Sequence, residues 1–175
     1  MPTLIHGLRS LSVLAALVAL TGLVGCSSEA GPSAAGKDVL LEAEPADAQD
    51  LADFKASLST GIGSGGQATI VGRVGSGGKE PWDTTQATFL LTSISLEDES
   101  HDHGGSDHSD CKFCQAKELE TMTLVRIVDE TGAVIPMDAR KLLGMKEKQI
   151  VVASGQGILD DGKLFFDASK IFIRE

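Results

Sequence analysis

The segment Gln149–Arg174, QIVVASGQGILDDGKLFFDASKIFIR, decides the fold that the sequence predicts. Two apolar runs, Gln149–Gly155 and Lys163–Arg174, flank the tripeptide Asp160–Gly162, and Asp-Gly between apolar runs is typical of a β-hairpin turn. The second run is expected to bend over Asp167–Ser169. We therefore predict that the chain closes with two antiparallel strands.

Three earlier strands and a short helix are expected before this hairpin. The strands are predicted over Gln67–Val74, Ala87–Leu96 and Thr121–Asp129. Residues 138–143 have the pattern of a short helix, because Asp138 can cap its start and Gly144 can end it.

A further helix is expected near the start of the domain, over residues 45–58. Its first residue is a proline, which suits a first helical turn, and Asp50 lies near the positive end of the helix dipole. Leu51, Phe54 and Leu58 fall on one face at helical spacing. We expect this apolar stripe to pack on the domain.

The order of three strands, a short helix and a two-strand hairpin is that of the OB-fold, a Greek-key barrel. Gly72, Gly155 and Gly157 stand in strand contexts, which fits a strongly bent, closed sheet. The predicted class is mainly β: a small five-stranded OB-fold-like barrel with an N-terminal helix. A short helix is expected between strands 3 and 4, and a polar loop is inserted between strands 2 and 3. A small β-sandwich is the competing architecture.

Residues 1–25 are predicted to be a lipoprotein signal peptide. Leu11–Val24 is an apolar run after Arg9, and it is too short to span a bilayer, which needs about 20 apolar residues. The sequence LVGC at residues 23–26 resembles the lipobox of bacterial lipoproteins. That resemblance implies cleavage before Cys26, a diacylglycerol on its sulfur and acylation of the new amino terminus. An ordinary secretory signal with an incidental cysteine is the alternative.

Residues 26–43 begin with a Gly-, Ser- and Ala-rich run and are expected to form a flexible tether to a domain over residues 44–175. Losing residues 1–25 removes Arg9 and no acid, which leaves 14 Lys and Arg against 25 Asp and Glu, a net charge of −11. This balance argues against nucleic acid as a partner, because phosphate binding depends on Lys and Arg.

The expected location is outside the cytoplasm, with the chain lipid-anchored to a bacterial membrane. Ser27 after the lipidated cysteine favours the outer membrane. The expected partners are the membrane, through the N-terminal lipid, and an unidentified protein or small ligand.

Residues 44–175 resemble a group of uncharacterised lipoproteins from planctomycete-type bacteria. The likeness is carried by Glu44-Pro45, Val71–Gly75 leading to Pro81-Trp82, Ala87–Leu90, Asp138–Gly144 and the closing strands over Ile150–Arg174. It implies an OB-fold-like domain and lipid anchoring, and it implies no activity and no catalytic residue. This chain departs from the group in placing a His-rich stretch before its cysteine pair, so no ligand scheme is carried over.

The polar loop over residues 97–118 contains the residues with metal-binding chemistry. Its first part, Glu97–Cys114, reads EDESHDHGGSDHSDCKFC and holds three of the four histidines and both cysteines that remain after Cys26. Thiolates and imidazoles are the usual zinc ligands, and a structural site takes four of them. The candidate ligands are His101, His103, His108, Cys111 and Cys114. His108 and the two cysteines would supply three ligands, and one upstream histidine would supply the fourth.

Three alternatives to zinc stay open for this loop. Copper could take its place, because thiolates suit Cu(I) and imidazole suits either oxidation state. Cys111 and Cys114 could instead form a disulfide in an oxidising compartment, which would leave the histidines as an exposed, weak metal-binding tract. The loop could also hold no stable ligand.

The sequence predicts no enzyme. It has no G-x-S-x-G motif and no P-loop, and Gln115 stands where haem attachment of the c type needs a histidine. The expected function is therefore a lipid-anchored extracytoplasmic binding or structural module with a zinc-ordered loop. The alternatives are a periplasmic or cell-surface metal-handling protein for zinc or copper, and a disulfide-stapled module without stable metal.

Overall fold

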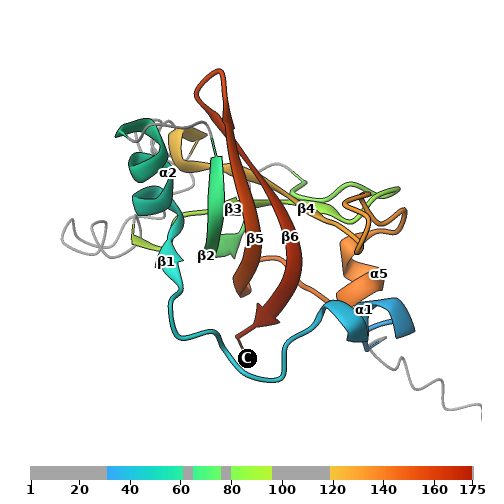
Figure 1. Cartoon of the computed structure of the whole chain (residues 1–175). Helices are drawn as coiled ribbons and strands as arrows, with labels where there is room; N and C mark the ends of the chain where they lie inside the picture. Colours follow the sequence, from blue (N-terminus) through green and yellow to red (C-terminus); the bar gives the residue numbers. More distant parts are fainter. Residues whose placement is uncertain (1–30, 61–64, 76–79, 96–118, 175) are drawn as a thin grey trace, which may run out of the picture.

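A computed structural model describes residues 31–60, 65–75, 80–95 and 119–174 (Figure 1). Nine helices and strands of these residues carry labels in Figure 1, and their bounds follow in chain order. They are α1 (Ala34–Val39), β1 (Gln49–Asp50), α2 (Leu51–Thr60), β2 (Gly65–Val74), β3 (Thr88–Thr92), β4 (Thr123–Ile127), α5 (Ala139–Leu143), β5 (Ile150–Asp160) and β6 (Lys163–Ile173). The chain is mainly β, as the sequence predicted.

The six strands form one mixed sheet in the order β1-β2-β3-β4-β6-β5, and β5 also pairs with β2. Two neighbouring pairs, β1–β2 and β4–β6, are parallel, and the others are antiparallel. The β2–β5 ladder is long and runs from Gly65↔Ile158 to Arg73↔Ile150. It joins β5, at one end of the strand order, to β2 near the other end. The strand pairings therefore return to β2, with β1 attached beside it.

The predicted C-terminal hairpin is confirmed. Asp160 pairs with Lys163, and the two residues between them, Asp161 and Gly162, have φ of 46° and 73°. Positive φ at both central positions is the geometry of the two-residue turn that matches the twist of antiparallel strands. β5 is longer than expected, since it continues beyond Gly155 to the turn.

The expected bend near the middle of the last strand is also present. The β5–β6 register passes from Ser154↔Lys170 to Gly155↔Ala168, so Ser169 is an extra residue on β6. A β carbon on Gly155 would lie 2.0 Å from the backbone oxygen of Asp167. The strands can approach this closely only because residue 155 is a glycine.

The core lies inside the circuit of strands, and α2 closes one side of it. Phe54 of α2 packs edge-on against Phe166 of β6, with 6.0 Å between the ring centroids. Gly157 makes room for this ring, because a β carbon there would lie 2.3 Å from a Phe54 ring carbon. Burying a side chain as large as Phe54 contributes about 1.5–3 kcal/mol, so α2 is held by its apolar face.

α5 follows the sequence prediction closely. The Asp138 carboxylate accepts a hydrogen bond from the Arg140 backbone N–H at the start of the helix. Gly144 ends the helix with φ of 72°, a conformation that favours glycine.

Two segments before the sheet differ from the prediction. The helix expected over residues 45–58 begins only at Leu51, because Gln49 and Asp50 pair with Ile70 and Val71 as the short strand β1. This strand brings the number of strands to six, where five were expected. α1 lies within residues 26–43, the range assigned to a flexible tether, and it packs against α5.

Candidate functional site at the base of the polar loop

The residues predicted to carry chemistry lie outside the part of the chain that the structure describes. These are the lipidation site Cys26, the candidate metal ligands His101, His103 and His108, and the cysteines Cys111 and Cys114, which are candidates for metal binding or a disulfide. The structure does place the two ends of the loop. The loop connects β3 to β4, the second and third predicted strands, and Leu91 pairs with Thr123 across its base.

The incoming end of the loop is held by one carboxylate, that of Asp50. Its Oδ1 accepts hydrogen bonds from the Ser93 hydroxyl at 2.6 Å and from the Ser95 hydroxyl at 3.3 Å. Its Oδ2 accepts from the backbone N–H groups of Ile94 at 3.1 Å and Ser95 at 3.3 Å. The first oxygen also accepts from the Ala52 N–H at 2.8 Å, so the same carboxylate caps α2.

The outgoing end of the loop is held by α2, the helix that begins directly after Asp50. Lys55 of α2 donates from its ammonium group to the backbone oxygen of Glu120. Residues 119–121, drawn in yellow, lie beside α2 in Figure 1. Since Asp50 and Lys55 are five residues apart, their α carbons are separated by about 7.5 Å along the helix axis. We call α2 with Asp50, Lys55, Ser93–Ser95 and 119–121 the loop base.

The junction between β1 and α2 follows from local sequence. β1 ends at Asp50 because the carboxylate caps the next residues, and Leu51 then starts the helix with a fully buried side chain. Ser93 is almost completely buried, with 3% of its surface exposed, so its hydroxyl needs a partner. The sequence pattern indicated Asp50 only as a dipole residue, and its partners at positions 93–95 could not be found from spacing.

A second polar cluster surrounds Arg140 of α5. Arg140 donates to Asp138 at 2.6 Å and to Glu80 at 3.1 Å, and its guanidinium lies 5.7 Å from the Trp82 ring centroid. The Arg140 hydrogen bonds hold the pKa of Asp138 below its ordinary value. This arrangement attaches the segment before β3 to α5. Both carboxylates of the cluster are paired with Arg140, so the cluster is best explained as a structural contact.

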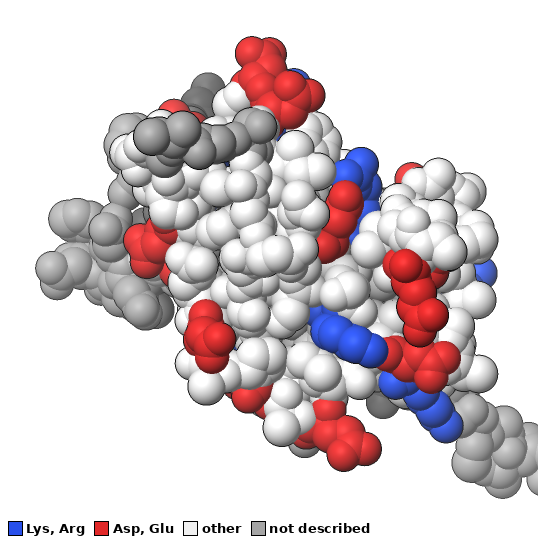
Figure 2. Space-filling view, in the orientation of Figure 1, with Lys and Arg blue, Asp and Glu red and all other residues white. Residues whose placement is uncertain are grey.

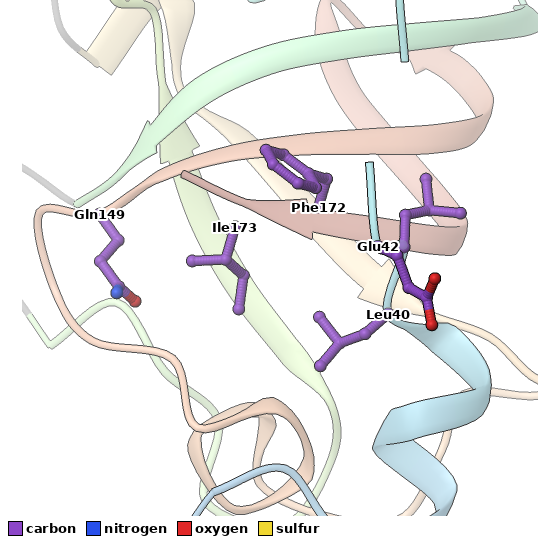
Figure 3. A pocket seen from close by; sticks show the side chains of 6 residues that line it. Leu40, Glu42, Gln149, Phe172 and Ile173 are labelled. Atoms are coloured by element: carbon purple, nitrogen blue, oxygen red, sulfur yellow. The ribbon is translucent and has the colours of Figure 1, made fainter. Parts of the chain in front are cut away.

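A shallow groove of about 580 Å³ lies between the end of α1 and the end of β6 (Figure 3). It is lined by Leu40, Leu41, Glu42, Gln149, Phe172 and Ile173. Figure 3 shows the polar ends of Glu42 and Gln149 apart from each other, with apolar side chains between them. The groove therefore brings no pair of polar groups together for catalysis.

Within the described ranges, no group of three or more His, Cys, Asp and Glu side chains is arranged to hold a metal ion. Within those same ranges, no helix is long and apolar enough to cross a membrane. Comparison of the chain with known protein families, curated proteins and solved structures finds no match in any of the three.

Proposed function

We propose that the protein is a lipid-anchored, extracytoplasmic binding module in which an OB-fold-like barrel presents a metal-binding loop. The observation that carries this proposal is the loop base. The continuous β1–α2 segment binds both described ends of the loop, through Asp50 at the end of β1 and Lys55 in α2. Because both ends of the loop are anchored, part of the entropic cost of closing it is already met. This lowers the cost of bringing its metal-ligating side chains together around an ion.

The barrel part of the proposal is supported by strand order. Apart from β1, the pairings run β2-β3-β4-β6-β5 and return to β2. The parallel contact between β4 and β6, with α5 preceding β5, corresponds to the OB-fold arrangement of a strand meander, a helix and a closing hairpin. β1 is then an additional strand at the edge of this barrel. The resemblance to planctomycete-type lipoproteins also favours an OB-fold-like domain.

The metal part rests on the donor set of the loop. Two cysteines three positions apart and a nearby histidine, His108, offer three ligands of the type that zinc prefers. His101 or His103 would complete a four-ligand structural site. The proposed role of zinc is to order the loop as a binding surface above α2.

The test is elemental analysis and thiol titration of the mature protein, purified without a histidine tag. About one zinc per chain is expected, with Cys111 and Cys114 reacting with a thiol reagent only after a chelator is added. The double variant Cys111→Ser/Cys114→Ser should lose the metal. The matched variant Ser106→Ala/Ser109→Ala changes two residues of the same loop that are not ligands, and it should keep the metal.

Two results would overturn parts of this proposal. Metal-free protein with an intact Cys111–Cys114 disulfide would replace the zinc site by a covalent staple. A mass spectrum of the N-terminal peptide without diacylglycerol on Cys26 would remove the lipid anchor. Recovery of copper in place of zinc, with rapid exchange, would instead support a metal-handling protein.

A further inference from the structure

The chain enters the domain at one defined place. Ser33 caps α1, its backbone N–H donates to the Leu142 oxygen at 2.9 Å, and its hydroxyl donates to the same oxygen at 3.2 Å. Gly36 lies directly against this backbone, since a β carbon there would be 1.8 Å from the Leu142 oxygen. α1 is therefore seated on α5, and the first residues of the domain are held at this side.

Because α1 is seated on the domain, the stretch between the lipid and the domain is shorter than the tether to residue 43 that the sequence predicted. The inference rests on the proposed function, in which Cys26 carries the lipid. Only seven residue steps separate Cys26 from Ser33, and an extended chain of that length spans at most about 25 Å. Because Ser33 is bound to α5, the side of the molecule that carries α1 and α5 must stay close to the membrane.

The loop base lies on the far side. In Figure 1, α2 is separated from α1 and α5 by the strands β2, β5 and β6. The loop that it anchors, residues 96–118, contains seven Asp and Glu and two Lys, a net charge of −5 out of −10 for the whole chain. The two described ends of this acidic loop thus lie at the side away from the chain entry.

The side of the molecule that carries α1 and α5 has more basic than acidic residues. We define the α1/α5 face as residues 34–39 and 138–149, which hold five Lys and Arg and three Asp and Glu. Lys37, Lys141 and Lys148 of this face are exposed. In the view of Figure 2, most Lys and Arg atoms lie in the right half, with Asp and Glu atoms among them, whereas the left half shows Asp and Glu atoms almost alone.

We propose that the α1/α5 face docks on an anionic phospholipid surface, so that the anchored protein presents α2 and its loop away from the membrane. One net positive charge near such a surface strengthens association about fivefold, so the net charge of +2 on this face biases the orientation about 25-fold. The acidic loop adds to this bias, because the same surface repels it. The short tether limits how far the domain can turn away.

The test is lysine footprinting of the lipidated mature protein in vesicles. One vesicle is pure phosphatidylcholine and the other contains phosphatidylglycerol, and an amine-reactive reagent is added from outside. In the anionic vesicles, modification of Lys37, Lys141 and Lys148 is expected to slow several-fold. Lys163 at the hairpin turn is the reference, and its rate should not change. High salt should remove the protection, because it screens exposed charges.

A charge variant separates docking from simple crowding by the tether. In Lys37→Gln/Lys141→Gln, Lys148 should lose most of its protection in anionic vesicles, whereas Lys163→Gln should leave Lys148 protected. Equal lysine rates in the two vesicles, with the protein still floating with them, would overturn the docking and keep the lipid anchor. Failure to float with either vesicle would overturn the anchor and the docking together.

Discussion

The strongest test of the loop base is to remove the carboxylate of Asp50. In Asp50→Ala, α2 loses its cap, at a cost of about 1 kcal/mol. The buried Ser93 hydroxyl and the N–H groups of Ile94 and Ser95 also lose their acceptor. Hydrogen bonds to a charged group contribute about 1.5–3 kcal/mol each, and partial exposure of Asp50 lets water replace some of them. We expect the free energy of unfolding to fall by about 2–4 kcal/mol in total.

Urea denaturation of the variant and amide hydrogen exchange at Ile94 and Ser95 measure this effect. Asp53→Ala is the matched control, because Asp53 is an exposed acid in the first turn of the same helix. It should reproduce only the dipole contribution, about 0.3–1 kcal/mol. Asp50→Ala with a loss no larger than that of Asp53→Ala, and with unchanged exchange at positions 94 and 95, would refute the loop base.

Two further predictions concern packing and pH. Gly157→Ala should cost about 1–3 kcal/mol, because the new methyl group would overlap the Phe54 ring, whereas Gly66→Ala meets no atom within 4 Å and should leave the urea midpoint unchanged or slightly raised. Equal midpoints for the two variants would contradict this packing. Asp138 has a pKa below its ordinary value of 3.8, mainly because of its hydrogen bond from Arg140. The unfolded chain binds the proton more tightly, so the ionised carboxylate stabilises the protein above about pH 4, and this is lost as the pH falls through the folded pKa. The difference in urea midpoint between the wild type and Asp138→Asn should therefore shrink from pH 7 to pH 2, and a constant difference would argue against this pair.

Local signals were sufficient for the hairpin and for α5. Asp161 and Gly162 adopt positive φ, as a two-residue turn requires, and neighbouring residues decide that conformation. Asp138 and Gly144 likewise cap α5 through contacts within a few positions. Capping and turn geometry depend on short-range sterics and hydrogen bonds, which is why the residue types predict them.

Longer-range features were not predictable from spacing. β1 has only two residues, so no periodic pattern marks it, and it exists because β2 offers it a partner. α1 is short and rich in small residues, a composition typical of a tether. Its seat on α5 depends on the contact of Gly36 with Leu142, more than 100 positions away.

The sequence by itself determined the mainly β class, the turn and caps, the acidic balance and the residue types of the loop at 97–118. Only the tertiary structure decided that Asp50 at the end of β1 and Lys55 of α2 hold the two ends of that loop. Asp50 and Ser93 are 43 positions apart, and their meeting requires β2 to pair with β1 on one side and with β3 on the other. The physical reason is that the type of a polar residue does not indicate which distant residue will form a hydrogen bond with it. Apolar burial and strand pairing bring the two segments together, and the carboxylate then accepts the donors that it meets.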